Sequence, residues 1–338
     1  MVEGVETPRP GCPKRMVWGP CGGVQPGGGC EVEPDRTCDF VAQPVAYRSG
    51  FPPARTGVGP VAGRPFVVTD FHVRPRDRGS VRRVAESLHG TCDTVLVADH
   101  GARRADFPPG YVAAQLVALG IRPWVTLSCR DRNAAALEAE CAALADLGVA
   151  GVHCVTGDWV TPATPVFDLD SLRLVERAAN RGLTVSVAAS PAAPPVEGRP
   201  HRLAAKASAG ATVCFVNHCG GPEVVARFVA AARGAGAGMR FLPCVPVISD
   251  PASASSLAAL PGLVLDRDVV ARVAGAGGDP EMGILAAEAE AQAMLSIPGV
   301  SGVNLSGAAS TTSETESAAM MARLGERIRR LPGGPERI

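Results

Sequence analysis

Pro65-Phe-Val-Val-Thr-Asp70 is a short apolar run that ends in a carboxylate, and seven similar runs follow it along the chain. Segments with helical periodicity separate these runs, so the pattern predicts alternating strands and helices. The strands are expected at residues 65–70, 94–100, 123–129, 149–155, 183–189, 212–216, 240–248 and 300–305. The helices are expected at residues 80–89, 110–119, 133–147, 168–180, 200–209, 223–233, 250–260, 279–296 and 314–331.

This alternation predicts an α/β protein whose strands are parallel and covered on both faces, because each run is apolar throughout. A closed (β/α)8 TIM barrel satisfies the edges of all eight strands. The alternative is an open doubly wound sheet, which typically carries a glycine-rich phosphate loop after its first strand. Here the first strand is followed by Phe71-His-Val-Arg-Pro75. The barrel is therefore favoured.

Four cysteines lie in the first forty residues, and glycine and proline are frequent between them. Eight, eight and seven residues separate Cys12, Cys21, Cys30 and Cys38. A segment with so little apolar content gains folding energy from a bound metal, on the order of 10 kcal/mol. The spacings lack the paired Cys-x-x-Cys knuckles of common zinc sites and the tight run of ferredoxins. Zinc, an iron–sulfur cluster and four free thiols therefore all stay open.

We accordingly expect residues 1–40 to form a small cysteine-rich metal-binding module, the cysteine module, which precedes the barrel. Residues 41–62 are rich in proline, glycine and alanine and are expected to be a linker. The barrel is expected to cover residues 63–332.

The 338-residue chain has 33 acidic and 33 basic residues, so its formal net charge is zero. This balance argues against binding to nucleic acid or to an anionic membrane, and favours a small-molecule substrate. The chain contains no apolar run of transmembrane length and no signal-peptide pattern at its N-terminus, so we expect a cytoplasmic protein. Lys14 and Lys206 are its two lysines, and their rarity singles both of them out.

Active sites of such barrels lie at the carboxyl ends of the strands. The histidines His72, His100 and His218 each follow a strand, and two interpretations of them stay open. They could bind a metal or exchange protons, or they could simply form hydrogen bonds at the mouth of the barrel. The other polar residues at the strand ends are Asp70, Asp99, Ser128, Cys129, Arg130, Asp131, Asp158, Ser190, Asn217, Cys219 and Ser249.

An ordered set of motifs gives the chain a family resemblance. The motifs are Thr126-Leu-Ser-Cys-Arg-Asp-Arg-Asn133, Val155-Thr-Gly-Asp158, Val185-Ser-Val-Ala-Ala-Ser-Pro191, Lys206-Ala-Ser-Ala-Gly-Ala211 and Arg240-Phe-Leu-Pro-Cys-Val-Pro-Val-Ile-Ser249. In this order they make the barrel resemble methylenetetrahydrofolate reductase. The cysteine module resembles the cysteine-rich C-terminal module of the same family, placed here at the N-terminus.

The resemblance implies reduction of 5,10-methylenetetrahydrofolate to 5-methyltetrahydrofolate, a step of one-carbon metabolism that serves methionine biosynthesis. The hydride would come from NADH or NADPH and pass through FAD at the barrel mouth. By this resemblance Asp70 occupies the place of the glutamate that helps to protonate the folate, and Asp158 lies near the flavin. The remaining implied contacts are Asn217, His72 and Ser128 for the substrate, and Thr126, Ser190 and Lys206 for the cofactor.

The chain also departs from the family at several of these positions. Thr126 replaces a histidine, Ser190 a tyrosine and Asn217 a glutamine, while Ala98-Asp99 replaces a Thr-Tyr pair. The expected flavin contacts are therefore smaller or differently charged. Three hypotheses follow: a flavin-dependent reductase, a reductase in which NADH reduces the folate directly, and a non-catalytic or electron-relay folate-binding subunit of a larger one-carbon complex. In the third hypothesis, the cysteine module would contact the partner subunit. Assembly of the chain into a homo-oligomer is a further alternative that the sequence leaves open.

Overall fold

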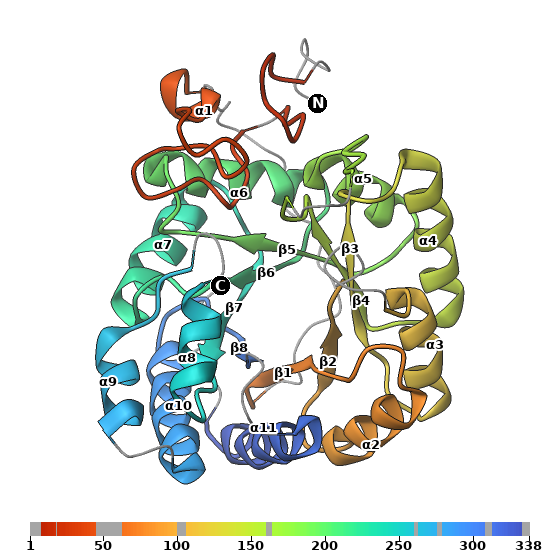
Figure 1. Ribbon diagram of the computed structural model, residues 1–338, viewed down its shortest axis with the longest axis vertical. Coiled ribbons are helices and arrows are strands. Elements are labelled where there is room, and N and C mark those ends of the chain that lie inside the picture. Colours follow the sequence, from red (N-terminus) through yellow and green to blue (C-terminus); the bar gives the residue numbers. More distant parts are fainter. Residues whose placement is uncertain are drawn as a thin grey trace.

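The computed structural model describes residues 8–17, 19–44, 63–99, 106–159, 164–259, 263–275, 279–307 and 313–332. Eight parallel strands follow one another around a closed barrel, and β8 pairs with β1 to complete it (Figure 1). The predicted TIM barrel is thus confirmed. The strands are β1 (Phe66–Phe71), β2 (Thr94–Val97), β3 (Trp124–Ser128), β4 (Gly151–Val155), β5 (Val185–Ala189), β6 (Val213–Val216), β7 (Arg240–Pro246) and β8 (Gly302–Ser306).

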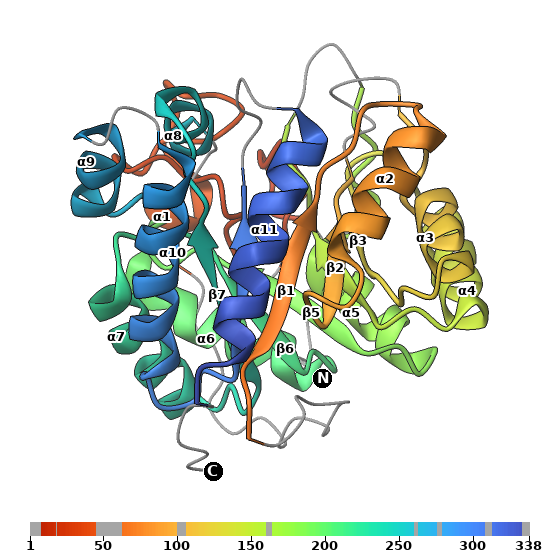
Figure 2. The same cartoon turned by 90° about the horizontal axis from the view of Figure 1, so that it is seen from below.

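Helices surround this barrel, and each predicted helix overlaps an observed one. Figure 2 shows α11 beside β1 and α2, where the last helix closes the ring onto the first strand. The helices are α1 (Asp39–Ala42), α2 (Arg78–Leu88), α3 (Pro109–Ala118), α4 (Ala134–Leu147), α5 (Ser171–Asn180), the 3-10 helix η1 (Val196–Gly198), α6 (Arg199–Ser208), α7 (Pro222–Gly234), α8 (Pro251–Ala258), α9 (Arg267–Gly275), α10 (Pro280–Leu295) and α11 (Glu314–Arg329). Of the described helices, α1, η1 and α9 were not predicted.

Local sequence signals fix several of the helix starts that border the mouth. Asn133 accepts a hydrogen bond from the Ala136 amide at 2.9 Å and caps α4. Asp170 caps α5 in the same way through the amides of Leu172 and Arg173, both at 3.1 Å. Each cap satisfies amides that the helix itself leaves unpaired. The loops after β3 and β4 therefore end at defined points.

Large apolar side chains fill the inside of the barrel. The rings of Trp124 and Phe215 lie 6.0 Å apart, and those of His153 and Phe215 lie 5.0 Å apart. These contacts join strands that are not neighbours in the sheet, so the rings must meet inside the barrel. Val68, Val213 and Leu242 complete this inner cluster. A second apolar layer fills the space between the strands and the surrounding helices.

The cysteine module is held together by turns and a few backbone hydrogen bonds. Gly29 and Thr37 form an antiparallel bridge, and the Cys30 and Cys38 amides donate to the carbonyls of Arg36 and Gly28 at 2.7 and 2.9 Å. The module lies beside α6 at the rim of the barrel (Figure 1). Helix α1 crosses the expected module boundary at residue 40, and the expected linker lies outside the described residues from residue 45 onward.

Among the described helices, none is both long and apolar enough to cross a membrane.

Candidate functional site

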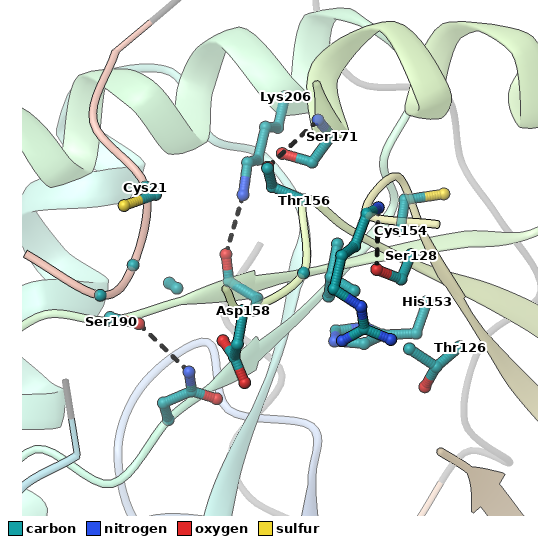
Figure 3. A pocket seen from close by; sticks show the side chains of 18 of the residues that line it. Cys21, Thr126, Ser128, His153, Cys154, Thr156, Asp158, Ser171, Ser190 and Lys206 are labelled. Atoms are coloured by element: carbon teal, nitrogen blue, oxygen red, sulfur yellow. Dashed lines mark hydrogen bonds between the residues drawn. The ribbon is translucent and has the colours of Figure 1, made fainter. Parts of the chain in front are cut away.

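A cavity of ≈ 400 Å³ opens at the carboxyl ends of β2 to β6, and the cysteine module forms one of its walls. In Figure 3, Cys21 of the module approaches this cavity from the same side as Ser190 of the barrel. Residues singled out from the sequence that line it are Lys14, Cys21, Asp99, Thr126, Ser128, Arg130, Asp158, Ser190, Lys206 and Asn217. The sequence analysis did not single out His153, Arg199 and Arg202, which line it too.

Two residues predicted for the site, Asp70 and His72, are not part of the lining of this cavity. Asp70 lies near the end of β1, where its Oδ1 accepts a hydrogen bond from Asn304 Nδ2 at 3.0 Å. Burial raises the pKa of Asp70 to about 6, against the opposing hydrogen bonds from Asn304, Ser306 and the Gly307 amide. This carboxyl is therefore able to hold a proton near neutral pH.

Of the three predicted histidines, His72 and His218 are described, and neither belongs to a described group of three or more side chains that could hold a metal ion. His72 follows β1 and His218 follows β6, while His100 lies outside the described residues. His218 is buried, its Nε2 has no hydrogen-bond partner, and burial lowers its pKa to about 4. It lines a separate small pocket with Cys219 and Cys244. The metal interpretation of these histidines thus gains no support.

Helix α6 presents a buried cationic pair to the cavity. Lys206 is 8% exposed and its Nζ donates to the Ala188 carbonyl at 3.0 Å (Figure 3). Arg202, one turn earlier, is 5% exposed, and its Nη1 has no hydrogen-bond partner. Burial and then the charge of Arg202 lower the pKa of Lys206 to about 7. An anionic group in the cavity would satisfy both side chains.

The loops after β2 and β3 contribute charges that largely neutralise one another. Asp99 and Arg132 form an ion pair at 2.7 Å, and the Asp99 side chain is only 3% exposed. Arg130 pairs with Asp131 at 2.7 Å and lies 4.0 Å from Asp99. Salt bridges therefore fix the positions of the side chains in this part of the wall, and the paired charges leave it with little net charge.

The floor of the cavity is polar and neutral. His153 Nδ1 lies 2.9 Å from Ser186 Oγ, and burial lowers the pKa of His153 to about 3. Asn217 Nδ2 donates to Ser190 Oγ at 3.1 Å. Such groups orient a ligand by hydrogen bonds without placing a charge beneath it.

Gly157 brings the backbone after β4 close to this floor. Its φ is +90°, and a Cβ there would lie 2.1 Å from Ser128 Oγ and 2.9 Å from Arg130 Cβ. Only glycine tolerates both the conformation and the close approach. Gly157 therefore sets the position of the neighbouring Asp158.

The module is docked on the barrel by specific contacts. Arg199 of α6 is 6% exposed, and its Nη1 donates to the carbonyls of Cys21 at 2.9 Å and Pro20 at 3.4 Å. A Cβ on Gly22 would lie 3.0 Å from Ser190 Oγ, so the module backbone approaches the Ser190 side chain closely. Within the module, Lys14 and Glu31 form an ion pair at 2.7 Å, with side chains 4% and 6% exposed, and Glu31 Oε1 accepts a hydrogen bond from the Trp159 amide of the barrel at 3.0 Å.

The four module cysteines are described, but the structure does not gather them into a metal site. Among the described residues, no group of three or more His, Cys, Asp or Glu side chains could hold a metal ion. Cys21 lines the cavity, and burial raises its pKa to about 11. Burial also raises the pKa of Cys12, and Coulomb interactions with Cys38 and Cys30 act in the same direction. The metal site at Cys12, Cys21, Cys30 and Cys38 stays a prediction.

Known proteins resemble the two parts of the chain separately. Residues 2–48 match the family described as "Methylene-tetrahydrofolate reductase C terminal". A search of curated proteins finds no match.

Solved structures resemble the barrel. A protein described as an uncharacterized protein from Clostridium thermocellum that binds two copies of 5-methyl-5,6,7,8-tetrahydrofolic acid superposes with a TM-score of 0.60 at 12% identity, over 79% of this chain and 96% of that one. 2,3-Dimethylmalate lyase gives 0.44 at 14% identity over 71% and 74% of the two chains. Oxaloacetate acetylhydrolase with 3,3-difluorooxalacetate gives 0.43 at 12% over 72% and 75%.

The similarities to the lyase and the hydrolase are too low to bear on function. The first similarity supports the barrel fold alone. The chain therefore combines a segment similar to the methylene-tetrahydrofolate reductase C-terminal family, residues 2–48, with an eight-stranded (β/α)8 barrel.

Proposed function

We propose that the chain reduces 5,10-methylenetetrahydrofolate to 5-methyltetrahydrofolate with NADH or NADPH in the cavity at the barrel mouth. The observation that carries the proposal is that module and barrel share this cavity. Lys14 and Cys21, from the segment that matches the reductase family, line it together with Asp158 and Lys206. A module that only braced the fold would have no reason to form a wall of the ligand cavity.

The α6 side of the cavity suits the phosphates of a dinucleotide cofactor. Arg202 and Lys206 are buried there, and the Arg202 Nη1 atom lacks a partner. A pyrophosphate would supply the missing acceptor and negative charge. Reduced flavin, formed from FAD by NADH or NADPH, or the reduced nicotinamide itself would supply the hydride when bound there. Thr126 and Ser190 are smaller than the histidine and tyrosine that would contact a flavin. The proposal therefore includes both a flavin-dependent reductase and one that transfers the hydride directly from the nicotinamide.

The polar floor suits a folate. Ser190 and Asn217 offer hydrogen bonds from β5 and β6, and His153 is neutral beneath them. Asp70 stands near the end of β1 with a pKa raised to about 6. The barrel relative from Clostridium thermocellum is described as binding 5-methyltetrahydrofolic acid, which is the proposed product. This supports a reduced folate as the substrate class.

The proposed reaction needs one proton donor and one hydride. A proton must reach the folate nitrogen that leaves the methylene bridge, so that the bridge opens to an iminium ion. Asp70 lies outside the lining of the cavity, so it serves as this donor only for a folate that extends from the cavity towards the end of β1. The hydride then adds to the methylene carbon and gives the methyl group. Asp158 holds a negative charge beside the cavity, where it stabilises the positive charge that develops during ring opening.

Two measurements on the purified chain test the proposal. NADH or NADPH oxidation is followed without oxygen, with and without 5,10-methylenetetrahydrofolate, and the product is identified by chromatography. We expect folate-dependent oxidation that yields 5-methyltetrahydrofolate. An absorbance spectrum then separates the two forms, since a flavin spectrum supports the FAD route and activity without one supports direct transfer. No folate-dependent oxidation by either nucleotide would refute the reductase.

The second candidate is a folate-binding subunit without reductase activity. It is favoured by the position of Asp70, which does not line the cavity that contains Asp158. Tight binding of 5-methyltetrahydrofolate by a chain that oxidises neither nucleotide would support this candidate.

A further inference from the structure

We propose that Glu31 of the cysteine module, held by its ion pair with Lys14, positions the start of the loop after β4 through the Trp159 amide, so that the barrel-mouth cavity binds its ligand only when the module is docked. The inference rests on the proposed function for the identity of the ligand, a reduced folate. It assigns to the module a role at the site itself, through Glu31 and the Trp159 amide.

The first step of the argument is that Glu31 connects the module to the barrel. Glu31 Oε2 pairs with Lys14 Nζ at 2.7 Å, and Glu31 Oε1 accepts a hydrogen bond from the Trp159 amide at 3.0 Å. Trp159 directly follows Asp158, which lines the cavity. One carboxylate from the module thus holds the backbone next to the carboxylate at the site.

The second step is that the pair is enclosed. The side chains of Lys14 and Glu31 are 4% and 6% exposed. A buried ion pair gives up much of its Coulomb energy to desolvation, so it is weak evidence for a purely stabilising role. It does, however, fix geometry, because neither charge can leave its partner without a large penalty.

The third step is a stack of side chains around Lys14. Its ammonium lies 5.8 Å from the centroid of the Phe167 ring, and the rings of Phe167 and Trp159 stack at 6.0 Å and 22°. Phe167 is buried and has φ of +42°, a conformation that costs a non-glycine residue energy. Arg15, next to Lys14, has φ of +50°. Backbone strain of this kind persists where the surroundings impose it, and here it occurs on both sides of the module–barrel contact.

Replacing both charges separates positioning from stability. Lys14→Met with Glu31→Gln keeps an amide oxygen that accepts from Trp159, whereas Lys14→Met with Glu31→Leu does not. Both double variants remove the buried charges, so neither leaves an unpaired ion. Binding of 5-methyltetrahydrofolate to the full-length chain is measured by calorimetry. Lys14 lines the cavity, so its loss affects both double variants alike, and the comparison is between them: we expect the Leu variant to bind about tenfold more weakly than the Gln variant, or worse.

A second pair of variants displaces Glu31 without removing any charge. A Cβ on Gly23 would lie 1.9 Å from Glu31 Oε2, whereas a Cβ on Gly27 would meet nothing within 4 Å. Gly23→Ala should therefore weaken binding by about tenfold, and Gly27→Ala should leave it unchanged. Hydrogen–deuterium exchange at the Trp159 amide should accelerate in Gly23→Ala and in the Leu double variant only.

The ligand-binding outcomes also separate this inference from the proposed function. If the wild type does not bind 5-methyltetrahydrofolate, the proposed ligand is wrong. If the wild type binds and the Gln and Leu double variants have equal affinities, whether unchanged or equally weakened, the positioning role is overturned. Arg64→Met serves as the stability control, because the Arg64–Asp93 pair at 2.6 Å lies at the opposite end of the barrel, before β1 and β2. It should lower stability and leave affinity intact.

Discussion

Asp70 is the residue whose environment is most directly testable. Its pKa is raised to about 6 from 3.8 because burial disfavours the ionised form. The stability that the neutral carboxyl contributes is fully present below pH 3.8 and is lost as the pH rises through 6. The amide of Asp70→Asn cannot ionise, so this variant does not lose stability as the pH rises through 6.

Asp70→Asn should therefore gain stability relative to the wild type between pH 4.5 and pH 8, by about 2 kcal/mol. Urea denaturation of both proteins at the two pH values measures the difference. Two proteins whose stabilities change in parallel with pH would show that this carboxyl is already ionised at low pH.

The same residue and Asp158 should matter for catalysis. Asp70→Asn removes the proton donor and Asp158→Asn removes the negative charge at the cavity, so each should lower folate-dependent NADH oxidation by about tenfold or more. Steady-state rates at saturating folate measure the effect. Asp146→Asn, on the exposed face of α4, is the control and should be silent. Unchanged rates in both site variants would remove these two residues from the mechanism.

Lys206 and Arg202 test the cofactor side of the cavity. Lys206→Met and Arg202→Met each remove one buried cation from α6. If the cations hold a pyrophosphate, each change should raise the KM for the nicotinamide or weaken FAD retention by about tenfold or more, with a smaller effect on folate affinity. Equal losses of folate and cofactor affinity would indicate that the helix itself had moved.

Some of these residues could be singled out from the sequence and some could not. Asp158 and Asn217 follow strands, and parallel strands bring their carboxyl ends together, so their convergence was predictable. Lys14 lies far from them in the chain, and only the docking of the module brings it to the cavity. The one sequence feature that singled out Lys14 is that the chain has two lysines, Lys14 and Lys206.

At the scale of elements, the loop after β4 depends on Gly157. Gly157→Ala would place a Cβ 2.1 Å from Ser128 Oγ and would displace either that side chain or the loop. We expect a loss of about tenfold or more in affinity for 5-methyltetrahydrofolate. Gly182→Ala is the matched control, because Gly182 also has a positive φ, +77°, but its Cβ would meet nothing within 4 Å. It should lose about 1 kcal/mol of stability and keep its affinity.

The elements themselves were largely predictable. Apolar runs and helical periodicity placed all eight strands, and the boundaries differ by a few residues because strand ends depend on pairing with neighbours. The largest difference is β2, expected over residues 94–100, which ends at Val97. Helix α9 was missed although α8, at eight residues, is shorter. Its segment lies between Pro261-Gly262 and Gly275-Ala-Gly-Gly278, which are typical of loops.

At the scale of the whole molecule, the site belongs to two parts of the chain. The barrel contributes Asp158 and Lys206, while the cysteine module contributes Lys14 and Cys21. The sequence predicted both parts but not their contact, because docking depends on the surfaces of α6 and the β4 loop rather than on any local pattern. The cysteine module, which the sequence predicted only as a unit that precedes the barrel, also forms a wall of the cavity.

The most direct measurement is the anaerobic turnover of 5,10-methylenetetrahydrofolate by the full-length chain with NADH or NADPH. The proposed function predicts consumption of one nucleotide for each 5-methyltetrahydrofolate formed, and loss of that turnover in Asp158→Asn. Absence of the product with both nucleotides, in a folded protein supplied with FAD, would contradict it.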